Sequence, residues 1–386
     1  MNDILVLPGG FRYQCTGCGN CCRGWNIHVD ETSHQNIVTS ECFEKLKAEC
    51  GSELFTRNER DFTLSTARRG SGDCVFLDRE ALCIIHREGS YDEKPLVCRQ
   101  FPFKMIRTPG GVFVGMSFFC RSCQRNTGIP VESYEQEMMK WLPMKHCRVA
   151  GESGIVIEEG LTVDWQGYLS MEDHITEYIS ENEDMEGALR KSMIDICTLS
   201  LKLRREGVTF AASEHISRLL GESPILPEIE VFRESSLFYT AAVAGVLESS
   251  SPEASRANTE AILSGGFLRS GVFGKDISMA KFSQYYRENP CSWKVPHIRR
   301  YIEHLVFRKQ LLGQEPVLCN LAGILTAHGL LEFYLYLSAY QSGKTSPDME
   351  DLYFSYGFVE KKFAAHTSTM MPFFKVFAEG FLNLLT

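Results

Sequence analysis

The sequence lacks several patterns that would assign it to a common class of protein. The first residues, MNDILVLPGG, hold no basic segment and only a short apolar run, so we expect neither a secretory signal nor an anchor helix. Negative charge exceeds positive charge, with a formal net charge of -9, which argues against nucleic acid as the main partner. No GxGxG-type loop follows a strand pattern, so a Rossmann-like nucleotide site is not visible. These absences favour a cytoplasmic protein.

A long uninterrupted hydrophobic run is also missing. The nearest candidate is the segment 317–340, but Asn320, His328 and Glu332 interrupt it and two glycines divide it. Polar groups of this kind are costly in hydrocarbon, so we predict a buried helix or helix pair and no membrane span.

Cysteine is the residue in which the sequence is rich, with fifteen in 386 residues. Clustered cysteines in a reducing compartment predict metal or redox chemistry more readily than a disulfide framework. Cys42 and Cys50 stand apart, and Cys197 and Cys319 lie in apolar stretches typical of buried core thiols. The predicted metal ligands fall into four blocks, which are Cys15-x2-Cys18-x2-Cys21-Cys22, Cys74-x8-Cys83, Cys98-Arg-Gln-Phe-Pro and Cys120-x2-Cys123.

The spacing within these blocks suggests more than one metal ion. A CxxC turn lets two thiolates converge on one ion, so two such turns with further cysteines can build tetrahedral sulfur sites. The neighbouring side chains of Cys21 and Cys22 should point in different directions and share one tetrahedral ion only with strain. We therefore favour an iron–sulfur or multi-metal assembly, while zinc held by four thiolates stays open. Convergence of Cys21, Cys74, Cys83 and Cys98 around a common centre would support these ligand assignments directly.

Arg23, Arg99 and Arg121 each follow a cysteine directly. A guanidinium near thiolates lowers the electrostatic cost of gathering several negative sulfurs. It can also donate forked hydrogen bonds to the carboxylate or phosphate of a ligand. Both roles are open for these arginines, whereas His86, beside an Ile-Ile step, is more typical of a structural histidine than of an auxiliary ligand.

The composition of the sequence changes near residue 150. Before it the chain is rich in cysteine and interrupted by glycine, and after it long amphipathic stretches predominate. We predict a mainly α protein, with an irregular α+β metal-binding or cluster-binding domain over 1–150 and an α-helical bundle over 151–386. Short strands are expected at 62–66 and 111–115, a hairpin at 155–164, and a flexible crossing at 249–255. Helices are expected over 30–48, 185–206, 210–220, 231–247, 298–312, 317–340, 349–363 and 370–385.

The cysteine blocks resemble a known family. The blocks that carry the resemblance are CxxCxxCC at 15–22, Cys74-x-Phe-Leu, Cys83-Ile-Ile-His and Cys98-Arg-Gln-Phe-Pro. Together they are similar to the bacterial cysteine-cluster family of zinc- or iron-chelating domains. The stretch Cys-Cys-Arg-Gly-Trp-x-Ile-x-Val-Asp and the spacing from Cys83 to Cys98 look like its flagellin lysine-N-methylase branch. The resemblance is strong over about residues 10–125 and weaker afterwards.

The resemblance implies a 4Fe-4S cluster and transfer of a methyl group from S-adenosylmethionine to a lysine of a protein such as flagellin, with Arg23 or Arg99 facing the cofactor carboxylate. The CxxxCxxC triplet of radical enzymes is absent, because Cys18 and Cys22 give the first interval but Trp25 holds the third position. The alternative is a non-catalytic zinc- or iron-chelating or electron-transfer protein whose helical half docks a partner.

Overall fold

The computed structural model describes residues 4–23, 27–59, 62–144, 148–221, 230–364 and 367–385. The chain forms two compact units. The cysteine unit comprises Leu7–Lys104 and Met116–His146, and the helical unit comprises Met1–Val6, Met105–Gly115 and Cys147–Thr386. The division is thus more complex than a single boundary at residue 150. The predicted fold class is confirmed, because a small cysteine-rich α+β region is combined with a mainly helical C-terminal part.

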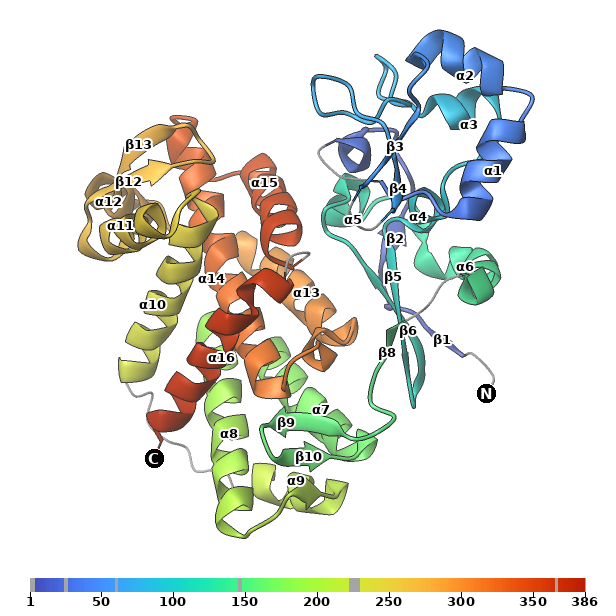
Figure 1. The fold of residues 1–386 in the computed structure, drawn as a ribbon. Coiled ribbons are helices and arrows are strands. Elements are labelled where there is room, and N and C mark those ends of the chain that lie inside the picture. Colours follow the sequence, from blue (N-terminus) through green and yellow to red (C-terminus); the bar gives the residue numbers. More distant parts are fainter. Residues whose placement is uncertain are drawn as a thin grey trace. The chain divides into compact units, whose positions relative to one another are not determined.

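The cysteine unit is built from short helices and two-stranded pairs (Figure 1). The single helix predicted over 30–48 is wrong. The side chain of Asp30 caps its start as expected, but the Ser40 hydroxyl donates to the carbonyl of Ile37 at 2.8 Å and the helix ends there. The elements of this unit are β2 (Arg12–Tyr13), η1 (Asn20–Cys22), α1 (Glu31–Thr39), α2 (Phe43–Cys50), β3 (Phe55–Arg57), β4 (Leu64–Thr66), α3 (Ile84–Glu88), α4 (Leu96–Gln100), α5 (Arg121–Arg125), β7 (Ile129–Pro130), η2 (Val131–Tyr134), α6 (Glu135–Trp141) and η3 (Leu142–Met144).

The helical unit contains most of a four-stranded sheet. Its order is β1-β6-β5-β8, with the strand expected at 111–115 confirmed as β6. Gly111 begins β6 at a φ of +120°, where a Cβ would lie 2.7 Å from the Ile4 carbonyl oxygen, so a side chain there would clash with β1. The strands are β1 (Leu5–Val6), β5 (Phe103–Thr108), β6 (Gly111–Met116) and β8 (Arg148–Val149).

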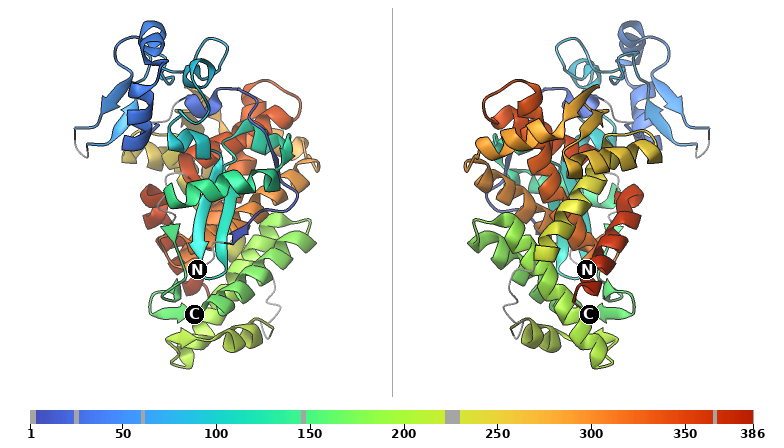
Figure 2. Two further views of the ribbon diagram at one scale, coloured as in Figure 1. Left: turned by 90° about the vertical axis from the view of Figure 1, so that its right-hand side faces the viewer. Right: turned by 90° about the vertical axis from the view of Figure 1, so that its left-hand side faces the viewer.

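The helical unit is a bundle around α14, which contacts α8, α10, α15 and α16 (Figures 1 and 2). The predicted hairpin is confirmed as β9 and β10. The crossing predicted at 249–255 is shorter than expected, because Ser251 caps a helix that begins at Pro252. The elements are β9 (Ile155–Glu158), β10 (Leu161–Val163), α7 (Trp165–Glu181), α8 (Met185–Arg205), β11 (Phe210–Ala211), α9 (Ser213–Gly221), α10 (Glu230–Leu247), α11 (Pro252–Ser264), β12 (Phe267–Ser270), β13 (Lys275–Ser278), α12 (Met279–Glu288), α13 (Lys294–Phe307), η4 (Gln310–Leu312), α14 (Val317–Gln341), α15 (Met349–Val359), η5 (Glu360–Ala364) and α16 (Thr367–Asn383).

The apolar segment predicted as a helix or helix pair is one continuous helix, α14. Its glycines do not divide it, because they serve as points of close packing. Gly323 faces the ring of Phe374 in α16, and Gly329 faces Thr240 in α10. By length and composition α14 could cross a membrane, but 83% of its most apolar window is buried inside the structure, as in a core helix.

Candidate metal centre

The backbone around the first cysteine block is shaped by two glycines. Gly17 and Gly19 have φ values of +65° and +71°, which residues with a Cβ rarely adopt. A Cβ on Gly19 would lie 3.0 Å from the Cβ of Ala81, so the block packs tightly against the loop that precedes Cys83. Gly19 then caps the single turn η1, which carries Cys21 and Cys22.

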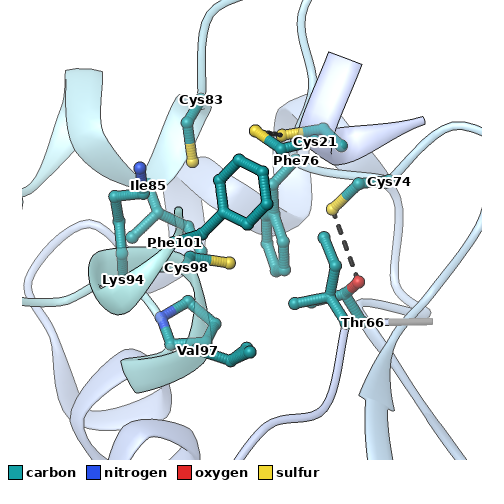
Figure 3. A pocket seen from close by; sticks show the side chains of 13 residues that line it. Cys21, Thr66, Cys74, Phe76, Cys83, Ile85, Lys94, Val97, Cys98 and Phe101 are labelled. Carbon is teal, nitrogen blue, oxygen red and sulfur yellow. Dashed lines mark hydrogen bonds between the residues drawn. The ribbon is translucent and has the colours of Figure 1, made fainter. Parts of the chain in front are cut away.

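Five cysteines line one pocket in the cysteine unit, which we call the thiol pocket. The five cysteines are Cys21, Cys22, Cys74, Cys83 and Cys98. Figure 3 shows the thiols arranged around a cavity whose walls include Phe76 and Phe101. The pocket has a volume of about 130 Å³ and a mainly apolar lining. The structure therefore brings Cys21, Cys74, Cys83 and Cys98 to one pocket, and Cys22 joins them there.

Hydrogen bonds of Cys74 join neighbouring chain segments at this pocket. The Cys74 amide donates to the Cys22 carbonyl at 2.9 Å, which joins the first and second blocks. The Cys74 thiol lies 3.4 Å from the Thr66 hydroxyl at the end of β4. Cys83 caps the start of α3, and Cys98 lies in the middle of α4. Residues far apart in the sequence thus supply sulfur to one cavity.

The vicinal pair does not behave as the sequence suggested. The sulfur atoms of Cys21 and Cys22 lie 3.9 Å apart, so the two side chains point toward each other and not in different directions. Four thiolates at about 2.3 Å from a zinc ion stand about 3.8 Å apart. The pair is thus able to share one ion without strain, and the adjacency of the two cysteines alone does not exclude zinc.

Burial and neighbouring sulfurs set the protonation of these thiols. Burial, together with the charges of neighbouring thiols, raises the pKa of Cys98, and burial raises the pKa of Cys74. The hydrogen bond between Cys21 and Cys22 has opposite effects on the two partners. It lowers the pKa of Cys21 to about 7 and raises the pKa of Cys22 far above its ordinary value. Cys21 is therefore the more acidic thiol of the pair.

Lys94 is a member of the pocket that sequence reasoning missed. Burial lowers its pKa, but Cys83, Cys98, Cys15 and Cys21 outweigh this effect and raise it. Its ammonium is the only formal positive charge among the residues that line the described pocket. The signal available in the sequence was its position four residues before Cys98, and in the structure Lys94 lies just before the short helix α4 that carries Cys98.

Cys50 is a second residue that the sequence did not single out. It ends α2 and packs against the hydrophobic cluster that contains Cys74, Phe76 and Ile84. Burial, with Cys74 and Cys83 among its charged neighbours, raises the pKa of Cys50 to about 11. The thiol lies beside the pocket wall and not among the lining residues.

The other predicted ligands do not line the thiol pocket. Cys120 caps α5 and Cys123 is fully buried within it. Cys15, Cys120 and Cys123 all add to the elevation of the pKa of Tyr13, whose largest cause is burial, so these three thiols share one neighbourhood. A hydrogen bond from Cys123 lowers the pKa of Cys120. Cys18 is exposed and does not line the thiol pocket.

None of the three predicted arginines lines the thiol pocket. Arg23 lies 3.8 Å from Asp73, and half of its side chain is exposed. Arg99 lies 3.7 Å from Asp92, and Arg121 donates to the Gln124 side chain at 3.3 Å. Trp25 lies outside the described residues. His86 packs edge-on against Tyr91 and is also absent from the pocket lining.

The cysteine blocks and their pocket correspond to a known domain. Residues 14–121 match the family model CxxCxxCC, described as "Putative zinc- or iron-chelating domain". Over this segment the chain is similar to that family. All five cysteines of the thiol pocket, with Lys94, lie within it. The match supports the binding of zinc or iron by the cysteine unit.

Two curated proteins are similar to parts of the chain. "Uncharacterized protein MJ0939" of Methanocaldococcus jannaschii is 28% identical over 174 residues, which cover 42% of this chain and 58% of that protein. "Flagellar biosynthetic protein FliU" of Salmonella muenchen is 24% identical over 108 residues, which cover 26% of this chain and 64% of that protein. The chain thus spans about three fifths of the length of these relatives. No solved structure matches it.

The thiol pocket fits a multi-atom group better than a single ion. Within the described residues, no three His, Cys, Asp or Glu side chains converge closely enough to hold one metal ion. Instead, five sulfurs surround about 130 Å³, close to the roughly 150 Å³ that accommodates benzene in an engineered cavity. Sulfur donors of this kind suit iron–sulfur clusters and zinc. Cys21, Cys22, Cys74, Cys83 and Cys98 are the residues that would hold such a group.

Proposed function

We propose that the cysteine unit binds an iron–sulfur cluster, of the 4Fe-4S type, in the thiol pocket. The main support for this proposal is that five thiols surround a cavity, whereas no three ligands among the described residues converge on the position of a single ion. Cysteine thiolates are the usual ligands of such clusters, and four suffice for one cluster. A fifth thiol at the same pocket leaves one cysteine for a role other than ligation. When bound, the cluster would supply electron transfer or a Lewis-acidic iron.

The residues of the pocket have clear roles around such a group. Ile27, Phe76, Ile85 and Phe101 exclude water from its walls, and a low local dielectric strengthens each charge interaction inside. Several thiolates gathered in an apolar pocket repel one another. The ammonium of Lys94 offsets this repulsion from within the pocket.

Zinc is the alternative occupant, and metal analysis separates the two. The protein would be purified without oxygen and its iron, zinc and acid-labile sulfide measured per chain. Iron with an equal amount of sulfide, and a brown colour, is the expected result. A colourless protein with one zinc per chain and no sulfide contradicts the cluster and leaves a zinc-chelating domain.

A second candidate function is methyl transfer from S-adenosylmethionine to a protein lysine. It is supported by the sequence resemblance to the flagellin lysine-N-methylase branch and by the similarity to a protein named for flagellar biosynthesis. In this reaction a neutral lysine amine attacks the methyl carbon, the carbon–sulfur bond breaks, S-adenosylhomocysteine leaves, and the methylated amine loses a proton. Arg23, Arg99 and Arg121 stay candidates for the cofactor carboxylate.

Transfer of labelled methyl groups tests this candidate. The metal-loaded protein would be incubated with labelled S-adenosylmethionine and purified flagellin, with a bacterial extract as a second substrate source. Label in a protein lysine supports the enzyme. The absence of both label and calorimetric heat with S-adenosylmethionine favours the non-catalytic alternative, in which the helical unit docks a partner protein in the cytoplasm.

A further inference from the structure

A second pocket lies entirely within the helical unit, between the start of α8, the end of α12 and the helices α13 and α14. We call it the acidic pocket. Its volume is about 270 Å³, several times the roughly 30 Å³ that one water molecule occupies in the liquid. Four carboxylates line it against one ammonium, and these charged residues are Glu183, Asp184, Glu186, Glu332 and Lys294.

The inner wall of the acidic pocket already binds an ammonium group of the protein itself. Lys294, only 9% exposed, lies 2.7 Å from the Glu332 carboxylate and 4.8 Å from the centre of the Tyr336 ring. The Tyr286 hydroxyl donates to the same carboxylate at 2.9 Å. This wall shows how carboxylate and tyrosine groups of the pocket bind an organic cation.

Ion pairs balance only part of the negative charge of the acidic pocket. Lys294 balances Glu332, and Arg190 balances Glu186 at 2.5 Å. The exposed carboxylates of Glu183 and Asp184 then remain at the mouth. A cation that approaches the pocket therefore meets an attractive field.

His328 supplies an observation independent of the acidic residues. It lines the pocket from α14, one turn before Glu332, and only 4% of it is exposed. Its Nδ1 is buried and has no hydrogen-bond partner within the described part of the chain. Buried polar nitrogens normally have partners, so this imidazole is a polar group that a ligand in the pocket could engage.

We propose that the acidic pocket binds an aliphatic primary ammonium group. Its carboxylates would bind the charge, its imidazole would hydrogen-bond to the ligand, and its volume accommodates a chain of several carbons. A bare divalent cation fits poorly, because no three ligating side chains converge among the described residues. The ammonium could belong to a free diamine or to a lysine side chain of a protein. The inference does not rest on the metal centre.

Calorimetric titration of the full chain at low salt tests this proposal. The probes are cadaverine, Nα-acetyl-lysine amide and, as a neutral control, 1-pentanol. We expect saturable one-site heat with at least one amine and none with the alcohol. Binding of the lysine amide would point to a protein lysine, and binding of cadaverine alone to a free diamine. No saturable heat from either amine at about 10 mM, ten times the Kd of a weak site, overturns the proposal.

Charge variants locate the site. Glu183→Gln combined with Asp184→Asn removes two rim charges and keeps a capping side chain at the start of α8, so the fold should persist. Amine binding should weaken about tenfold or more, the usual effect of losing a charge-assisted contact. The matched control Glu181→Gln removes an exposed charge that does not line the pocket, and binding should be unchanged. Equal affinities for the rim variant and the native protein overturn the assignment.

Discussion

The thiols of the pocket differ from one another because each has a different neighbourhood. The hydrogen bond with Cys22 lowers the pKa of Cys21, whereas burial and other sulfurs raise the pKa of Cys98. A metal group must displace these protons before the sulfurs can coordinate it. The protonation of the site is therefore set separately for each thiol.

Replacement of Cys98 by alanine should remove most of the bound metal, because it deletes a sulfur from the pocket wall. The matched control is Cys197→Ala, which removes a fully buried thiol from α8 in the other unit. Both variants should lose on the order of 1 kcal/mol of stability. Only the first should lose metal, as measured by elemental analysis after anaerobic purification. Full metal content in the Cys98 variant would contradict its role.

The pH dependence of metal binding has a definite sign. Burial raises the pKa of Cys74 and Cys98, so these groups carry protons at neutral pH that metal uptake must release. The affinity should rise with pH from about 6 to 9, because thiolate is the binding form. The stability of the metal-free protein should instead fall as the pH rises above about 8.5, the ordinary thiol pKa. There the unfolded chain binds fewer protons than the folded one, and folding free energy is lost.

Titration in a weakly buffered indicator solution measures this proton release directly. Proton uptake on metal binding, or an affinity that does not change with pH, would contradict the protonated state of Cys74 and Cys98.

At the residue scale, the sequence predicted the cysteines better than their surroundings. The blocks implied that Cys21, Cys74, Cys83 and Cys98 would meet, because sulfur ligands for one group must converge. Lys94 was missed because a lone lysine four residues before a cysteine carries no distinctive pattern. The arginines were favoured for their adjacency to cysteine, but successive side chains need not face one cavity.

At the scale of elements, apolar periodicity indicated where helices lie, whereas glycines gave no reliable sign of where a helix ends. The apolar run at 317–340 was predicted as one helix or a helix pair because of its glycines, and α14 continues through Gly323 and Gly329. The sequence does not show that these positions face α16 and α10 at close range. The break between α1 and α2 was missed for a similar reason, since the competing hydrogen bond of Ser40 is a local detail.

The packing of α14 gives a prediction at this scale. A Cβ on Gly329 would lie 2.5 Å from the Thr240 hydroxyl oxygen, so Gly329→Leu should overpack the contact between α14 and α10. We expect a loss of about 1–3 kcal/mol in the free energy of unfolding, measured by urea denaturation. The smaller Gly329→Ala change should cost less. An unchanged stability in the leucine variant would show that the two helices do not pack closely there.

At the scale of the whole molecule, the chain consists of two compact units with different sources of stability. The cysteine unit has short helices and small strand pairs, so a bound metal group would add substantially to its stability. The helical unit has a large apolar core around α14. Removal of the metal should lower the melting temperature of the cysteine unit and leave the helical transition in place.

Circular dichroism and tryptophan fluorescence during thermal unfolding, before and after chelation, distinguish these outcomes. Two transitions are expected, of which only one shifts. A single transition that shifts as a whole would contradict independent stabilisation of the two units.

The composition of the native protein after anaerobic purification decides whether the thiol pocket holds a cluster. We expect about four iron and four acid-labile sulfide per chain, with visible absorption that bleaches on reduction. Simultaneous replacement of Cys21, Cys22 and Cys98 by alanine should abolish both iron and colour. One zinc per chain, without iron or sulfide in the native protein, would contradict the cluster.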